Sequence, residues 1–319
     1  MNAEDYVPRD LRRRRGPSLL GKRISLQLLR TRIPPSPRET AAFEEAMVQL
    51  RLTSGIYRTT FRERFRDLDP VVNALIADRF SSDARLVIHD WAASHCLTSS
   101  EWAASLFRLF PNATFVASDL TMFLIEVTLP DGAAFVLQPD GGALQYIRKP
   151  FVIRLSPPEP KMLFVNHVMG RMANARLTEL RQTLNIPQTW LDSDAETLSI
   201  PPYHLRRIPM THPEARELAQ RDERFSIRRH SAFEPLAEPA GVVRTMNLLT
   251  TVYFTDSRIG EGARAVWQSL VPNGFWIVGR TMEETLVHNA SVLKKTPGGF
   301  DVVARIGDGS DIERQVLAL

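Results

Sequence analysis

The segment from residue 85 to residue 119 constrains the fold more than any other part of the sequence. A short apolar run, Leu86–Ile88, is followed by a helical pattern and then by a second apolar run, Thr114–Ser118, that stops at Asp119. The stretch Thr98-Ser99-Ser100-Glu101 has the form of a capping box, which predicts that the helix begins there. A strand, a helix and a second strand in this order build a parallel sheet with a right-handed crossover, so we expect an α/β fold.

Composition excludes several classes of protein. The chain has 319 residues, of which 44% are hydrophobic, and this is enough for a sizeable core. Its single cysteine, Cys96, excludes an internal disulfide framework and a cysteine-based zinc cluster. The longest apolar candidate for a membrane span, Phe115–Leu129, is interrupted by Asp119 and Glu126. We therefore expect a soluble, cytoplasmic protein without a membrane span.

Positive charge is concentrated near the amino terminus. The formal net charge is +4, and residues 1–33 hold nine Lys/Arg against three acidic residues, so the rest of the chain is slightly acidic. The run Arg12–Arg15 could steer the chain to nucleic acid, to an acidic membrane surface or to an acidic protein, although such runs are more often solvated arms. Because Pro34-Pro35-Ser36-Pro37 cannot continue a helix, we expect residues 1–37 to be a basic, flexible arm.

Periodicity divides the remaining chain into two regions. Apolar residues at helical spacing over residues 38–80 predict a helical cap, and residues 81–319 are expected to form the α/β domain, with an insertion around residues 130–220. Inside the insertion, Pro139-Asp140-Gly141-Gly142 predicts a β-hairpin. Residues 160–184 have a helical pattern.

The end of the insertion and the C-terminal third have different patterns. Residues 186–213 are rich in proline and predict a long loop or lid. Strands are expected at Phe225–Arg229, over residues 242–249 and at Phe275–Val278, with a helix capped by Asp256 before the last of them. The runs Val292–Lys295 and Phe300–Ile306, joined by Thr296-Pro297-Gly298-Gly299, predict an antiparallel hairpin.

Ligands of open α/β sheets bind at the carboxyl ends of the strands, where the strand order reverses. The first strand is followed by residues 89–96, a run in which small residues alternate with larger ones, so a ligand can approach the backbone closely. The second strand ends at Asp119, and a carboxylate in that place is suited to accept both hydroxyl hydrogens of an adenosine ribose.

These residues carry a resemblance to a known family. Asp90, Ala92, Ser94 and Cys96 stand at the four fixed positions of the motif D-x-G-x-G-x-G, and the layout resembles the class I S-adenosylmethionine-dependent methyltransferases. All three glycines of the motif are replaced here. The stretch Trp91-Ala92-Ala93-Ser94 is more similar to the W-x-A-A-C/S-S loop of the chemotaxis-receptor glutamate methyltransferases, although the glycine that follows in that loop is missing.

Two later stretches resemble the chemotaxis-receptor type in the same order. The run Arg244–Phe254 is similar to its R-N-x-x-I-Y-F with four extra residues, and Leu270–Gly279 is similar to its L-x-P-G-G-x-L-x-x-G. The resemblance covers roughly residues 85–130 and 225–280. It implies a Rossmann-like class I methyltransferase sheet, mostly parallel, with a C-terminal antiparallel hairpin and S-adenosylmethionine as the cofactor.

The resemblance also implies which residues bind that cofactor. Asp90 and the turn over residues 92–96 would face the methionine part, Asp119 the ribose, and the segment after the Phe225 strand the adenine. Asn247 and Leu248 would lie beneath the sulfonium. The implied cofactor-binding residues are Asp90, Trp91, Ala92, Ser94, Cys96, Asp119, Leu120, Ser231, Ala232, Phe233, Asn247 and Leu248.

Methyl transfer is an in-line displacement at an activated carbon, so an enzyme mainly supplies proximity, alignment and a dry site. A carboxylate acceptor needs no base, whereas a hydroxyl or amine acceptor needs one, for which Tyr253, His95 and His230 are the candidates. Each assignment has a structural alternative. Asp119 could cap a helix starting at Leu120, Asp90 could bond the turn backbone, and the histidines and Cys96 could be ordinary turn or packing residues.

Three functions remain open. The first is methyl transfer to a small molecule or to a protein, at a carboxylate, a hydroxyl or an amine. The second is a catalytically degenerate, methyltransferase-fold binding protein that works through a partner, which the glycine-free loop suggests. The third is a nucleic-acid-modifying enzyme recruited by the Arg-rich arm, and the slightly acidic remainder without a base-reading motif argues against it. His167 and His288 lack metal-ligand spacing, so no metal is expected.

Overall fold

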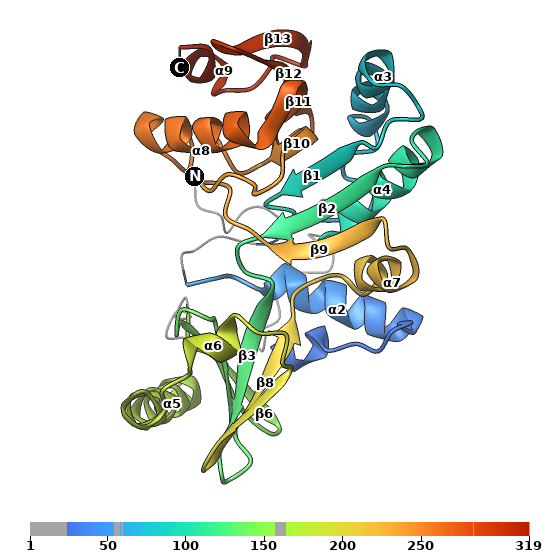
Figure 1. Ribbon diagram of the computed structural model, residues 1–319. Coiled ribbons are helices and arrows are strands. Elements are labelled where there is room, and N and C mark those ends of the chain that lie inside the picture. Colours follow the sequence, from blue (N-terminus) through green and yellow to red (C-terminus); the bar gives the residue numbers. More distant parts are fainter. Residues whose placement is uncertain (1–23, 54–57, 59, 157–163, 283, 319) are drawn as a thin grey trace. The chain divides into compact units, whose positions relative to one another are not determined.

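The computed structural model describes residues 24–53, 58, 60–156, 164–282 and 284–318 of the chain, drawn in colour in Figure 1. The run Arg12–Arg15 lies outside the described residues. The chain forms two compact units, one comprising residues up to 59 together with 121–213, the other residues 60–120 together with 214–319. We call them the inserted unit and the parallel-sheet unit.

The parallel-sheet unit is built on seven strands in the order β13-β12-β11-β10-β1-β2-β9 (Figure 1). Neighbours from β9 to β11 are parallel, and the last two strands add an antiparallel hairpin. This confirms the predicted Rossmann-like, mostly parallel sheet with its C-terminal hairpin. The strands are β1 (Val87–Trp91), β2 (Thr114–Asp119), β9 (Phe225–Arg229), β10 (Ala240–Met246), β11 (Leu270–Thr281), β12 (His288–Thr296) and β13 (Gly299–Ile306).

The helix α4 (Leu97–Leu109) connects β1 to β2, as the strand-helix-strand pattern predicts. It begins earlier than the predicted capping box at Thr98. Cys96 is the residue before the helix, and its left-handed backbone, with φ of 64°, turns the chain from the loop directly into the helix. The other helices of the unit are α3 (Asp69–Arg79), α7 (Pro213–Arg221), α8 (Asp256–Ser269) and α9 (Glu313–Leu317).

Two predictions for the C-terminal third need correction. The residue before α8 is Thr255 rather than Asp256, and it makes no side-chain capping bond. The expected strand over residues 242–249 starts earlier and ends at Met246, because Asn247 takes a left-handed conformation with φ of 61° and leaves the sheet.

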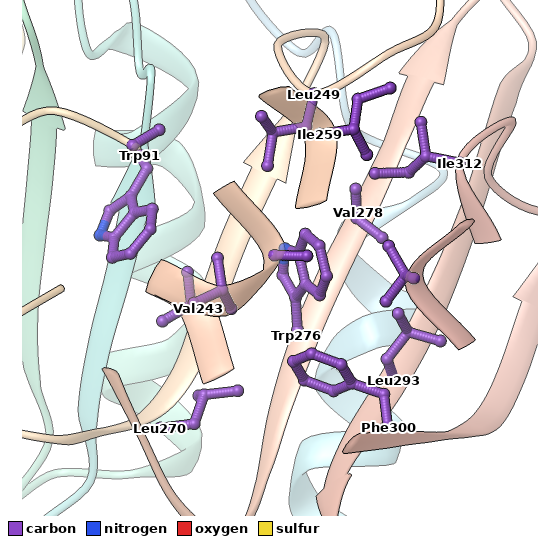
Figure 2. Close-up of a cluster of buried hydrophobic side chains, with 14 of the residues drawn as sticks. Trp91, Val243, Leu249, Ile259, Leu270, Trp276, Val278, Leu293, Phe300 and Ile312 are labelled. Atoms are coloured by element: carbon purple, nitrogen blue, oxygen red, sulfur yellow. The ribbon is translucent and has the colours of Figure 1, made fainter. Parts of the chain in front are cut away.

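One apolar core cluster of the parallel-sheet unit lies between its sheet and α8. Figure 2 shows Trp276 of β11 at the centre of this cluster, with Val243 of β10, Phe300 of β13 and Ile259 of α8 around it. These four side chains are at most 8% exposed. Complete burial of a side chain of this size contributes about 1.5–3 kcal/mol, so the cluster fixes α8 and the C-terminal hairpin on the sheet.

The inserted unit contains a second sheet of six strands in the order β6-β5-β4-β3-β8-β7, in which all neighbours are antiparallel. The hairpin predicted at Pro139–Gly142 is confirmed, because these residues connect β4 with β5. The strands are β3 (Phe123–Thr128), β4 (Ala134–Leu137), β5 (Ala143–Arg148), β6 (Phe151–Arg154), β7 (Thr197–Ile200) and β8 (Tyr203–Pro209).

Helices pack on both faces of this sheet. The 3-10 helix η2 (Leu26–Leu29) and α2 (Pro37–Gln49) share one apolar cluster with the sheet, and α5 (Phe164–Thr183) and α6 (Gln188–Leu191) share another. Residues 24–30 were expected to belong to the flexible arm. Instead Leu26 and Leu29 are buried, because an apolar pair three residues apart lies on one side of a 3-10 helix.

The structure also divides the predicted helical cap over residues 38–80, placing α2 in the inserted unit and α3 in the parallel-sheet unit. The predicted lid over residues 186–213 is wrong, since this stretch contains α6, β7 and β8. Strand β8 alternates buried and exposed side chains from Tyr203 to Arg206, a period of two that the prolines obscured. Pro201 and Pro202 form the turn between the two strands.

Among the described residues, no helix combines the length and the apolar character that crossing a membrane requires.

Candidate functional site

The candidate site is the carboxyl edge of the parallel sheet around β1. From β1 the chain adds β2 and then β9 on one side, and it later adds β10 and β11 on the other side, so the strand order reverses between β1 and β10. Ligands of open α/β sheets bind at such a reversal. The sequence analysis placed its site residues at the ends of these strands, among them Trp91 and Asp119 as the last residues of β1 and β2, and Asn247 directly after β10.

The loop after β1 has an alternating backbone. Ala92, Ser94 and Cys96 have φ angles of 55°, 55° and 64°, all in the left-handed region. These are the three positions at which the D-x-G-x-G-x-G motif has glycine. The left-handed conformation costs a residue with a side chain about 1–2 kcal/mol, whereas glycine adopts it freely. The loop therefore has the backbone conformation of a glycine loop although alanine, serine and cysteine disfavour it.

Hydrogen bonds hold this loop against the end of β2. The Ala93 N–H donates to the Ser118 carbonyl at 2.9 Å, and the Ser94 N–H donates to the Asp119 carboxylate at 2.9 Å. The carboxylate of Asp119 therefore lies beside the middle of the loop. The next element, β3, is a strand, so the alternative that Asp119 caps a helix starting at Leu120 does not apply.

Residues after β9 adjoin the same place. The His230 N–H donates to the Asp119 carbonyl at 3.2 Å, and the Arg229 guanidinium donates to the Leu120 carbonyl at 3.3 Å. The side chain of Leu120 is 57% exposed. The structure thus brings together the loop, Asp119, Leu120 and His230.

Asp90 lies below the loop and is buried. Its two carboxylate oxygens accept from Arg244 of β10 at 2.9 Å and 2.5 Å, and Ser99 donates to it at 2.6 Å. Arg244 also donates to Asp69 at 2.8 Å and lies over the Trp102 ring, 4.0 Å from its centroid. The network joins β1, β10, α3 and α4 beneath the loop.

One guanidinium faces two carboxylates in this network. Burial raises the pKa of Asp69 to about 7; Arg244 opposes this shift and the neighbouring charge of Asp90 adds to it. Asp69 is therefore partly protonated near neutral pH, and it serves Arg244 as an acceptor in either state.

Aromatic rings with buried nitrogens lie at the end of β1. The ring centroids of Trp91 and His230 are 4.6 Å apart. Within the described part of the chain, Trp91 Nε1 and His230 Nε2 are buried and have no hydrogen-bond partner. Burial lowers the pKa of His230, and it lowers the pKa of His89 to about 4, with further contributions from His230 and Arg228. His230 is thus neutral at pH 7.

The remaining predicted residues are distributed around this edge. His95 is buried in the loop, and the Tyr253 side chain is 51% exposed in the turn after β10. Asn247 joins β10 to β11, since its N–H donates to the Gly279 carbonyl at 2.8 Å and its side-chain oxygen accepts from the Thr281 N–H at 2.7 Å.

The segment Ser231–Phe233, which was expected near the adenine, packs against other residues of the parallel-sheet unit. The Phe233 ring meets the Phe254 ring at 5.2 Å between centroids, and Arg258 of α8 lies over it at 3.6 Å. Ala232 and Leu248 contribute to the same apolar cluster, and the Ser231 hydroxyl accepts from the Phe233 N–H at 3.3 Å. The structure therefore gives Phe233 contacts that do not involve Asp119.

Sequence reasoning missed the roles of Arg244, Asp69 and Ser99. A signal was present for Arg244, because it follows Val242-Val243 in a run expected to be a buried strand. A buried charge must be paired, so a partner on a neighbouring strand could have been sought. Nothing local marks Asp69 as that partner, since it is separated from Arg244 by most of the chain.

No group of three or more His, Cys, Asp or Glu residues in the described ranges is placed to hold a metal ion. The side chain of His167 is not among those that the structure describes.

No protein-family model matches the chain, and no curated protein matches it. Similar solved structures include an O-methyltransferase family protein from Burkholderia thailandensis, with 15% identity, TM-score 0.30 and coverage of 77% of this chain and 42% of that one. Human N-acetylserotonin methyltransferase, solved with SAM, has 10% identity, TM-score 0.28 and coverage of 77% and 39%. An O-methyltransferase from neocarzinostatin biosynthesis, solved with S-adenosyl-L-homocysteine and 1,4-dihydroxy-2-naphthoic acid, has 13% identity, TM-score 0.26 and coverage of 70% and 44%.

The chain spans less than half the length of each of these three structures. None of the three is a chemotaxis-receptor glutamate methyltransferase, and that part of the resemblance is not supported. At TM-scores of 0.26–0.30 the likenesses carry no conclusion about activity, so the candidate site rests on the geometry of this chain.

Proposed function

We propose that the parallel-sheet unit binds S-adenosylmethionine at the carboxyl edge of β1 and β2, and that the protein is a methyltransferase. The alternating left-handed loop carries this proposal. Its three left-handed residues coincide with the motif's glycines, and its central N–H is bonded to the carboxylate at the end of β2. In such an arrangement the carboxylate can bind the ribose hydroxyls of a nucleoside, and the turn can accommodate the methionine part attached to it.

In this proposal each residue has a physical task. Asp119 accepts hydrogen bonds from the ribose hydroxyls, and the backbone of Ala92–Cys96 accommodates the methionine part. Asp90 acts from beneath, because its oxygens hold Arg244 and Ser99 and so fix the end of β1. When bound, the sulfonium cofactor supplies an activated methyl carbon.

The acceptor side follows from the chemistry of methyl transfer. His230 adjoins Asp119, and its neutral ring could take the proton from a hydroxyl or an amine of a small molecule. A carboxylate acceptor would not need this step. Tyr253, in the turn after β10, is half exposed and is the second residue proposed on the acceptor side.

Isothermal titration calorimetry with S-adenosylhomocysteine tests the cofactor site. We expect the wild-type chain to bind this probe and Asp119→Asn to bind it at least tenfold more weakly, because a charge-assisted hydrogen bond contributes about 1.5–3 kcal/mol. The introduced amide oxygen can still accept from the Ser94 N–H, so the loop should stay folded. Asp301→Asn, an equal loss of charge at an exposed position of β13, is the matched control and should bind normally.

Equal affinity in the wild type and Asp119→Asn, or no binding by the wild type, would overturn the cofactor site. A normal affinity without methyl transfer to any hydroxyl, amine or carboxylate acceptor offered would instead favour the degenerate binding protein.

A further inference from the structure

The inserted unit has an open pocket of about 430 Å³ on one face of its sheet, and none of its lining residues belongs to the parallel-sheet unit. The strands β3, β8 and β7 form its floor, and Arg30, just after η2, lies at its side. A pocket of this volume is in the range that small-molecule ligands occupy. The lining residues are Arg30, Glu126, Thr128, Thr197, Leu198, Ser199, His204, Leu205 and Arg206.

The pocket exists because the side chains on this face of the sheet change from apolar to polar along the strands. Leu124 of β3 and Ile208 of β8 are fully buried in the cluster with η2 and α2. Two residues further along each strand, on the same face, stand Glu126 and Arg206. The apolar half of the face is therefore covered by helices, and the polar half remains open.

The charges of the lining are unbalanced. Glu126 is buried and is its one acidic residue; it pairs with Arg30 at 2.5 Å and accepts a hydrogen bond from Gln27. The Arg206 guanidinium forms no ion pair and no hydrogen bond with any described residue. Arg206 and His204 are both exposed, and the His204 ring forms one hydrogen bond within the described residues, with the Ser199 hydroxyl at 3.4 Å. Arg206 thus leaves the lining with a net positive charge.

Glu126, which lies opposite Arg206 on β3, is paired with Arg30, and the other polar side chains around Arg206 can donate hydrogen bonds to an anion. Thr128, Thr197 and Ser199 supply hydroxyls, and His204 supplies a ring N–H. Arginine binds carboxylates and phosphates through two parallel hydrogen bonds, and the bond from Gln27 fixes Glu126 and with it Arg30 at the pocket wall. Leu198 and Leu205 border the pocket through their backbone, because their side chains belong to the apolar cluster on the other face of the sheet.

We propose that this pocket binds a small acidic molecule through an oxyanion group, a phosphate or a carboxylate, held by Arg206 with Arg30, His204 and the neighbouring hydroxyls. The pocket is several times larger than one oxyanion, so the ligand carries an organic part. This assignment is independent of S-adenosylmethionine binding, because every lining residue belongs to the inserted unit.

Calorimetric titration of the full chain with inorganic phosphate and, separately, with succinate tests the proposal, with chloride at equal ionic strength as the reference. We expect saturable binding of at least one probe, and the stronger probe identifies the oxyanion of the natural ligand. Arg206→Gln should weaken it at least tenfold. Arg171→Gln, an equal loss of charge at an exposed position of α5, should leave it unchanged.

A second measurement locates the bound probe. The ring-proton resonance of His204, assigned by its absence in His204→Gln, should shift on titration in the wild type and in Arg171→Gln but not in Arg206→Gln. No saturable heat from either probe up to about 10 mM would overturn the proposal, and so would equal affinities in Arg206→Gln and Arg171→Gln.

Discussion

At the scale of single residues, the loop after β1 shows how a backbone can keep a conformation after its glycines are lost. Ala92 and Ser94 are only partly buried, so their side chains have room although their φ angles are unfavourable. Cys96 differs, because its side chain is fully buried and contributes packing that glycine could not. Strain and packing are therefore distributed unequally over the three positions.

Ala92→Gly should stabilise the parallel-sheet unit. Glycine removes the left-handed penalty of about 1–2 kcal/mol and adds a backbone entropy cost of about 0.5–1 kcal/mol, so the free energy of unfolding should rise by about 0.5–1 kcal/mol. Urea-induced unfolding measures this difference. Ala93→Gly is the matched control: Ala93 lacks a left-handed backbone and is buried, so its replacement should lower stability. Lower stability in both variants would contradict the assigned loop geometry.

Sequence reasoning reached part of the candidate site because its signals are local. A motif position, a strand end and a small-residue turn can be read from neighbouring letters, and they located Asp119 and the loop from Ala92 to Cys96. The pairing of Arg244 with Asp90 and Asp69 depends on strand register and on the position of α3. Such contacts between distant segments leave no mark in either local pattern.

At the scale of elements, the strands that were predicted correctly have a clear local sequence pattern, and the strands that were missed do not. The strands β1, β2, β9 and the last hairpin have uninterrupted apolar or alternating runs, which predicted them well. The hairpin β7–β8 contains Pro201-Pro202 and two adjacent arginines, Arg206 and Arg207, and it was assigned to a lid. Its alternation becomes clear when β8 is paired with β3 on one side and β7 on the other.

Leu205→Ala distinguishes a central strand from a mobile lid. Leu205 of β8 is 1% exposed, so its truncation should lower the free energy of unfolding by about 2–5 kcal/mol. His204→Ala, at the adjacent exposed position, should change it by no more than about 0.5 kcal/mol. Urea-induced unfolding compares the two, and equally small effects would mean that residues 203–209 are not part of the sheet.

At the scale of the whole molecule, the buried Arg244 network makes stability depend on pH. The pKa of Asp69 is raised in the folded chain to about 7, from 3.8. Between these values the folded chain keeps a proton that the unfolded chain releases, so this residue favours folding most below about pH 4 and loses that advantage as pH rises to about 7.

Asp69→Asn should remove this dependence while keeping an oxygen that accepts from Arg244. We expect the free energy of unfolding of the variant, relative to the wild type, to increase by at least about 1 kcal/mol between pH 4 and pH 8, since one pKa unit corresponds to about 1.4 kcal/mol. Urea-induced unfolding at both pH values measures it. A difference that stays constant, or decreases, would show that Asp69 titrates normally.

The discontinuity of the parallel-sheet unit sets an order of events during synthesis on the ribosome. Its first two strands are made by residue 119, but β9, β10 and β11 follow only after residue 213, when every segment of the inserted unit already exists. The inserted unit can therefore complete its antiparallel sheet before β10 and β9, the outer neighbours of β1 and β2, have been synthesised. A stop in translation before residue 240 would leave β1 with an open edge toward β10, and so a nascent chain prone to association until the second half emerges.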